Sequence, residues 1–175
     1  MEKKVAIILL NWNSYEHTAN CIESLSAVRP ANFDILVVDN GSTDGSGTAL
    51  QNKFNHIIYL PNATNEGFAG GNNRGFAYAI EHDYAYSLML NNDVFVEPNF
   101  LDLLVNYLEA NPAVGAIQPK IFFNSNRQKV WNGGSYFLSW LGWTYSKNYM
   151  RTAGPRQSKF AEVDWITGCA LLVRT

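Results

Sequence analysis

YSLMLNNDVFV, residues 86–96, indicates the fold of this chain more clearly than any other stretch. A short apolar run ends at Asn91-Asn92-Asp93, and a second apolar run follows at once. A buried strand that stops at two amides and a carboxylate places oxygen atoms at the carboxyl edge of a sheet, where open α/β sheets bind their ligands. Oxygen ligands of this kind suit a divalent cation. The stretch therefore predicts an α/β sheet with a cation and diphosphate site at one edge.

Residues 34–39 show the same arrangement earlier in the chain. The aliphatic run 35–38 ends in Asp39, and Asn40-Gly41-Ser42 follows it. An ionised carboxylate only accepts hydrogen bonds, so Asp39 is suited to bind the N3–H of uracil or thymine. The alternative is that Asp39 only caps the following turn. Two acids at the same edge of a sheet favour a nucleoside diphosphate site.

The composition indicates a folded chain and excludes several classes of protein. The 175 residues suffice for one domain, and 47% of them are hydrophobic, which predicts a packed core. The 13 basic and 15 acidic residues give a net charge of -2 and form no basic run, so we expect no nucleic-acid partner. No segment approaches the roughly 20 apolar residues of a membrane helix, so we expect no membrane span.

Strand-like and helix-like runs alternate through the first 110 residues. The expected strands are 5–10, 34–39, 57–60 and 87–90, and the expected helices are 15–28, 46–53, one that follows the polar stretch 62–73 and ends at 80, and 98–108. This order predicts a right-handed, mostly parallel βαβ sheet flanked by helices. Beyond residue 112 the pattern weakens to short extended runs at 114–117, 120–123, 163–166 and 170–173, and residues 124–160 show no period.

Two further segments belong at the same edge. Asn11-Trp12-Asn13 follows the first strand directly, although an ordinary polar turn would look the same. The glycine-rich stretch 65–75 opens a helix. Glycines let a backbone approach a ligand closely, and a helix N-terminus attracts phosphate. The spacing does not match a dinucleotide-binding fingerprint.

Taken together, five stretches resemble the inverting family 2 glycosyltransferases of the GT-A fold, especially their bacterial rhamnosyltransferase-like members. They are VAIILLNWN at 5–13, ILVVDNGSTDGS at 35–46, NEGFAGGNNRG at 65–75, LMLNNDVFVEPNFL at 88–101 and VDWITGCALLVRT at 163–175. The resemblance implies transfer of a sugar from a UDP- or dTDP-sugar donor to a saccharide or lipid-linked acceptor. It also implies a role in cell-surface polysaccharide synthesis, in the cytoplasm or peripherally at the inner face of the membrane.

The resemblance also implies roles for single residues. Asp39 would contact the base, and Asp93 would bind Mg²⁺ or Mn²⁺ as the carboxylate of the family's Asp-x-Asp motif. Asn72 stands where many relatives carry an arginine near the diphosphate. Trp165 and Gly168 would shape the acceptor side. The other residues expected to bind the nucleotide sugar are Asn11, Asn13, Asn65, Gly67, Asn91 and Asn92.

The resemblance makes the chain a single domain with an incomplete C-terminal end. Residues 1–110 would form the nucleotide-binding half, and residues 111–175 would begin the acceptor-side half. The family's catalytic base, usually in a Glu-Asp pair, follows the segment that matches 163–175, so we expect the base beyond Thr175. Asp164 is a weaker candidate for that role.

Two alternative functions remain open from the sequence. A fragment without the base would bind a nucleotide sugar without transferring it. A nucleotidyltransferase uses a similar sheet and metal, but its first loop would carry glycines with Arg and Lys, unlike residues 11–15. Aromatic residues after position 130 stack on acceptor sugars in one interpretation and pack against a remainder of the protein beyond residue 175 in the other, which we favour. They are Trp131, Tyr136, Phe137, Trp140, Trp143 and Tyr145.

Overall fold

The chain forms two compact units. The computed structural model describes residues 4–29, 32–154 and 160–175. The sheet unit comprises Met1–Ile117 and Gly168–Thr175, and the hairpin unit comprises Gln118–Thr167.

The sheet unit contains one six-stranded sheet in the order β3-β2-β1-β4-β10-β5. Four strands, β3, β2, β1 and β4, are parallel, and β10 runs antiparallel to both β4 and β5. Its elements are β1 (Val5–Asn11), α1 (Tyr15–Leu25), β2 (Phe33–Asp39), α2 (Ser46–Lys53), β3 (Ile58–Pro61), α3 (Gly67–Glu81), β4 (Tyr86–Leu90), α4 (Phe100–Ala110), β5 (Ala116–Ile117) and β10 (Ala170–Arg174). The predicted alternation and the mostly parallel sheet are confirmed.

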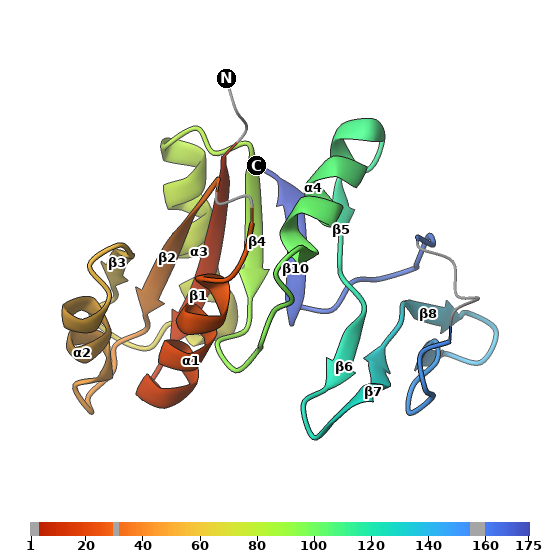
Figure 1. Cartoon of the computed structure of the whole chain (residues 1–175), viewed down its shortest axis with the longest axis horizontal. Helices are drawn as coiled ribbons and strands as arrows, with labels where there is room; N and C mark the ends of the chain where they lie inside the picture. Colours follow the sequence, from red (N-terminus) through yellow and green to blue (C-terminus); the bar gives the residue numbers. More distant parts are fainter. Residues whose placement is uncertain (1–3, 30–31, 155–159) are drawn as a thin grey trace. The chain divides into compact units, whose positions relative to one another are not determined.

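Helices cover both faces of β1, with α1 in front of the sheet and α3 behind it in Figure 1. Ile8 belongs to the buried cluster on the α3 side, together with Ala79 of that helix. Successive strand residues point to opposite faces, so Ile7 and Leu9 face the α1 side. This double burial explains why the sequence of β1 is a continuous aliphatic run rather than an alternating one.

The glycines of the stretch 65–75 act differently from the sequence interpretation. Helix α3 already begins at Gly67, so most of the stretch is helix. A Cβ atom on Gly71 would lie 2.3 Å from Leu10 Cδ1, and one on Gly75 would lie 2.4 Å from Ile8 Cγ2. These two glycines therefore bring α3 close to β1. Gly67, with φ +73° and open space where a Cβ would lie, and Gly70, whose Cβ would meet only Glu66, make no such contact with the strand.

The strand β10 is tied to its neighbours by Arg174. The guanidinium of Arg174 donates from Nε to the Val114 carbonyl oxygen at 3.1 Å and from Nη1 to the Tyr86 hydroxyl at 3.0 Å. The Tyr86 hydroxyl in turn donates to the carboxylate of Glu109 on α4. These bonds hold the antiparallel strand against β4 and α4.

The hairpin unit consists of two antiparallel strand pairs. They are β6 (Ile121–Phe123) with β7 (Asn126–Asn132), and β8 (Ser135–Leu138) with β9 (Trp143–Ser146). Three of these strands fall in residues 124–160, where the sequence showed no period, because their buried positions include polar residues such as Asn132 and Ser135. Residues 163–166 form no strand, and Trp165 makes only an isolated bridge to Ser135.

Candidate functional site

Strands β1, β2 and β4 end at one edge of the sheet, toward which their arrowheads point in Figure 1. Asn11 and Asp39 are direct partners in the parallel register of β1 and β2. Leu90, the last residue of β4, ends at the level of Leu9 on β1. The loop that begins at Asn91 therefore starts from the same edge as Asp39.

Asp39 is buried, and donors surround its carboxylate. Its Oδ1 atom accepts hydrogen bonds from Asn11 Nδ2 at 2.9 Å and from Ser42 Oγ at 2.5 Å, and its Oδ2 atom accepts one from the Tyr59 hydroxyl at 3.1 Å. A carboxylate offers about four acceptor positions, so room remains for one more donor. Burial and the charge of Asp39 raise the pKa of Tyr59 to about 12, which keeps that hydroxyl a donor.

Thr18 joins this carboxylate to the loop after β4. Its Oγ1 atom donates to Asn11 Oδ1 at 2.8 Å and accepts from Asn92 Nδ2 at 2.8 Å. Because Asn11 bonds Asp39, one path of hydrogen bonds runs from Asn92 through Thr18 and Asn11 to Asp39. We call these four residues the Thr18 relay.

Sequence reasoning missed Thr18, although its place on α1 carries a signal. Thr18 is fully buried, and it precedes Ile22 and Leu25 at helical spacing on the face that packs against the sheet. A hydroxyl among apolar residues on a buried face requires a partner. The side chain of Asn11, which ends the adjacent strand, is that partner.

Asn13 connects the loops that follow β1 and β2. Its backbone N–H donates to Ser42 Oγ at 2.9 Å, and its Oδ1 atom accepts from the Thr43 backbone N–H at 2.9 Å. Its φ angle is 48°, a left-handed conformation that asparagine tolerates better than most residues. Asn13 thus fixes the loop whose Ser42 hydroxyl reaches Asp39.

Asn40 organises the approach to α3. Its Nδ2 atom donates to Asn65 Oδ1 at 2.8 Å, and its Oδ1 atom accepts from the Glu66 backbone N–H at 3.1 Å. Asn65 Oδ1 also accepts from the Gly67 backbone N–H at 2.8 Å. Asn72 is buried within α3, where its Nδ2 atom donates to the Phe68 carbonyl at 2.8 Å. Asn65 and Gly67 therefore shape the loop next to Asp39, and Asn72 lies one turn further along the helix.

Asp93 is exposed, and its loop is held by the backbone. The Asn91 backbone N–H donates to the Cys169 carbonyl oxygen at 2.9 Å. Burial first, and then the charge of Asp93, raises the pKa of the Cys21 thiol to about 12 and that of the Cys169 thiol to about 11. The bond from Asn91 places the start of this loop beside the start of β10.

Asp93 alone cannot hold a metal ion. In residues 4–29, 32–154 and 160–175, no group of three or more His, Cys, Asp or Glu side chains is arranged to bind one. Asp93 supplies one carboxylate, which is hard and exposed, next to the amide side chains of Asn91 and Asn92. This donor set fits a divalent cation that receives its other ligands from a diphosphate and water.

The two residues predicted for the acceptor side belong to different units. Gly168 lies against β4 and α3 in the sheet unit, where a Cβ would be 3.3 Å from Met89 Cε and 3.5 Å from Phe68 Cε1. Trp165 is exposed in the hairpin unit. Asp164 is engaged in that unit, because its Oδ2 atom accepts from the Phe137 backbone N–H at 2.8 Å.

Comparison with known proteins gives a family match over nearly the whole chain. The profile of glycosyl transferase family 2 matches residues 6–174. An N-acetylglucosaminyl-diphospho-decaprenol L-rhamnosyltransferase of Mycobacterium tuberculosis is 27% identical over 196 residues, which cover 99% of this chain and 62% of that protein. Glycosyltransferase GlyA of Streptococcus pneumoniae is 23% identical over 152 residues, covering 78% of this chain and 21% of GlyA.

Solved structures with a similar fold include two glycosyltransferases. Residues 1–349 of TarS from S. aureus match with a TM-score of 0.62 and 18% identity, covering 82% of this chain and 43% of that one. The mannosyltransferase PcManGT from Pyrobaculum calidifontis, in complex with GDP-Man and Mn²⁺, matches with a TM-score of 0.58 and 18% identity, covering 72% of this chain and 37% of that one.

Proposed function

Because the chain belongs to glycosyl transferase family 2 and has the GT-A fold, we propose that it forms the donor-binding part of an inverting glycosyltransferase. The donor would be a UDP- or dTDP-sugar, and the acceptor a saccharide or lipid-linked hydroxyl in bacterial cell-surface polysaccharide synthesis. The chain spans 62% of the length of the mycobacterial relative, so the activity of a whole enzyme is part of this proposal. The Thr18 relay is the observation that supports it best, because it connects Asp39 with the loop that carries Asp93.

Asp39 would bind the base of the donor. Three neutral donors leave its carboxylate one acceptor position, which suits the N3–H of uracil or thymine. Tyr59 and Ser42 hold the carboxylate in place, so the base meets an acceptor that is already oriented. A TarS structure in complex with UDP is among the similar folds, which is consistent with a uracil base.

Asp93 would act at the diphosphate end. A bound Mg²⁺ or Mn²⁺ would neutralise the charge that develops on the departing nucleoside diphosphate. Asp93 would supply a carboxylate ligand, while the Asn91 side chain and the Asn92 Oδ1 atom would bond sugar hydroxyls. Asn92 Nδ2 already donates to Thr18, so the relay would hold the Asn92 amide in a fixed orientation.

Direct displacement with inversion also requires a base that removes the proton of the attacking hydroxyl. We assign this role to no residue in the described part of the chain. Asp164 fits it poorly, because it already accepts from the Phe137 backbone N–H. A non-catalytic nucleotide-sugar-binding role is therefore the second candidate.

Calorimetric titration with UDP, dTDP and GDP, each with and without Mn²⁺, tests the binding proposal. We expect UDP or dTDP to bind, and to bind more tightly when Mn²⁺ is present. Asp39→Ala should lose nucleotide affinity, whereas the control Asp34→Ala, at the opposite end of β2, should retain it. If no nucleotide binds, the proposal is wrong. Release of free sugar from the donor would distinguish an enzyme from a binding module.

A further inference from the structure

The hairpin unit exposes several large apolar side chains at one turn. The turn joins β8 to β9, and we call residues 138–143 the hairpin tip. Trp140 is 80% exposed, Trp143 is 62% exposed and Leu141 is 56% exposed. Contiguous exposed apolar side chains of this size typically mark a surface that binds a partner.

These side chains are not needed to close the turn. The Leu141 backbone N–H donates to the Leu138 carbonyl at 3.0 Å, and Gly142 supplies the positive φ of 64°. At the other end of the hairpin, the rings of Tyr136 and Tyr145 stack with centroids 5.5 Å apart. The backbone and this tyrosine pair support the hairpin, so the tryptophans at the tip contribute little to its shape.

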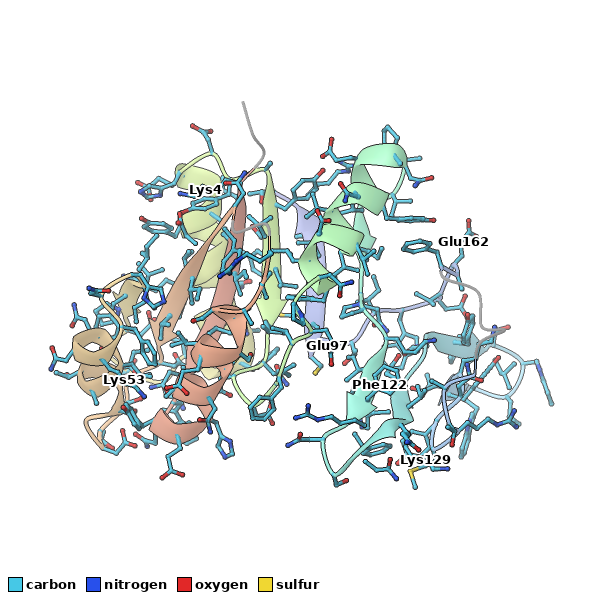
Figure 2. All side chains as sticks on the ribbon, in the orientation of Figure 1. Lys4, Lys53, Glu97, Phe122, Lys129 and Glu162 are labelled. Carbon is cyan, nitrogen blue, oxygen red and sulfur yellow. The ribbon has the colours of Figure 1, made fainter. Side chains whose placement is uncertain are left out.

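Charge is divided unequally between the two units. Residues 118–167 contain seven lysines and arginines and two acidic residues, whereas the rest of the chain contains six basic and thirteen acidic residues. Figure 2 labels Lys129 and Glu162, one residue of each sign in the hairpin unit. In the linear sequence the charges look evenly spread, and the asymmetry appears only when they are assigned to units.

The basic residues flank a long uncharged segment. No charged residue occurs from 130 to 146, between Lys129 and Lys147, so the whole β8–β9 hairpin is uncharged. Such a hairpin can leave water without desolvating a charge. An apolar turn with tryptophans, bounded by lysines, has the composition of a segment that lies in the interfacial layer of a membrane.

From this combination we propose that the hairpin tip inserts into the interface of an anionic lipid bilayer. Trp140, Leu141 and Trp143 would enter the boundary between head groups and acyl chains, and Lys129 and Lys147, which bound the uncharged segment, would lie against the acidic head groups. Pairing of two hairpin units with each other fits less well, because units that each carry an excess of five positive charges repel one another. This inference does not depend on the proposed function.

Flotation of the full-length protein with lipid vesicles tests the proposal. We expect binding to phosphatidylcholine vesicles that contain phosphatidylglycerol, weaker binding to phosphatidylcholine alone, and release at high salt. The double variant Trp140→Ser/Leu141→Ser should bind roughly tenfold more weakly, because it loses most of the buried apolar area. The matched control Ile80→Ser/Leu103→Ser removes two exposed apolar side chains from the sheet unit and should bind as the parent does.

A second readout locates the contact. Brominated lipids should quench the fluorescence of the parent on anionic vesicles, and Trp140→Phe, which stays apolar, should bind equally but show less quenching. Thermal melting and UDP titration of each variant establish that it is folded and that the nucleotide site is intact. Unchanged vesicle binding by the serine variant would overturn the proposal. So would equal binding to neutral and anionic vesicles, or a parent dimer that the serine variant converts to a monomer.

Discussion

Asn11, the last residue of β1, and Asn92, in the loop after β4, share the hydroxyl of Thr18 on α1. Thr18 Oγ1 lies 2.8 Å from Asn11 Oδ1 and 2.8 Å from Asn92 Nδ2. The hydroxyl is a donor in the first bond and an acceptor in the second, so both bonds form at the same time. These two bonds therefore connect the loop after β4 to the side chain that holds Asp39.

Replacing Thr18 with valine should break this connection without changing the volume of the side chain. Thr18→Val leaves the buried Asn11 Oδ1 without its donor and Asn92 without its acceptor. We expect the free energy of unfolding to fall by about 1–3 kcal/mol, the range for a buried polar group that loses its partner. Urea unfolding measures this loss. The control Thr18→Ser keeps the hydroxyl, and equal stability of the two variants would show that the relay contributes nothing.

Replacing Asp93 should abolish the effect of the metal ion on nucleotide binding and leave the fold unchanged. The Asp93 side chain is exposed, so Asp93→Asn should change the free energy of unfolding by no more than about 0.5 kcal/mol. The gain in UDP affinity that Mn²⁺ produces should disappear in the same variant. Calorimetric titration with and without Mn²⁺ measures both affinities. Glu97→Gln, an exposed acid four residues later in the same loop, is the control (Figure 2). If Mn²⁺ acts equally on Asp93→Asn and the parent, Asp93 is not a ligand.

Gly75 should tolerate no side chain. In Gly75→Ala the new Cβ would lie 2.4 Å from Ile8 Cγ2, which forces α3 away from β1. We expect a loss of about 1–3 kcal/mol, typical of an overpacked core. Gly115→Ala is the control, because no atom lies within 4 Å of its Cβ position. Thermal or urea unfolding of the two variants compares them, and equal stability would contradict the packing described here.

The Cys21 thiol should lower the free energy of unfolding at alkaline pH. Burial, followed by the charge of Asp93, raises the pKa of this thiol from 9.0 to about 12. As pH rises above 9.0, the unfolded chain loses the thiol proton before the folded chain does, so the free energy of unfolding falls between pH 9 and 12. Below pH 9 the thiol is protonated in both the folded and the unfolded chain, so this loss of stability does not occur. Urea unfolding across this range should show a smaller fall in the free energy of unfolding for Cys21→Ala than for the parent.

Much of the sheet unit could be predicted from sequence because its strands are buried on both faces. A continuous aliphatic run such as 5–10 is typical of a parallel strand covered by helices on each side, and the acids and amides that end the runs mark the edge. The glycines of α3 were harder to interpret. A glycine permits a close approach either to a ligand or to a neighbouring strand, and the sequence does not say which. The positions of Ile8 and Leu10 show that Gly71 and Gly75 pack against a strand.

The Thr18 relay and the hairpin unit lay beyond sequence reasoning for physical reasons. The relay joins residues 11, 18, 39 and 92, whose proximity depends on the order of the strands in the sheet. In the hairpin unit, Asn132 takes part in several local bonds, and its Nδ2 atom donates to Ser135 Oγ at 2.9 Å. A fold held by such local polar contacts leaves no hydrophobic period in the sequence.

In the proposed site, Asp39 and Asp93 bind opposite ends of one nucleotide. A crystal structure of the chain with UDP and Mn²⁺ would show both contacts at once. We expect the uracil N3–H within hydrogen-bonding distance of the Asp39 carboxylate, and Mn²⁺ bound to both the diphosphate and Asp93. A nucleotide whose base lies away from Asp39, or a metal ion that Asp93 does not contact, would contradict the account.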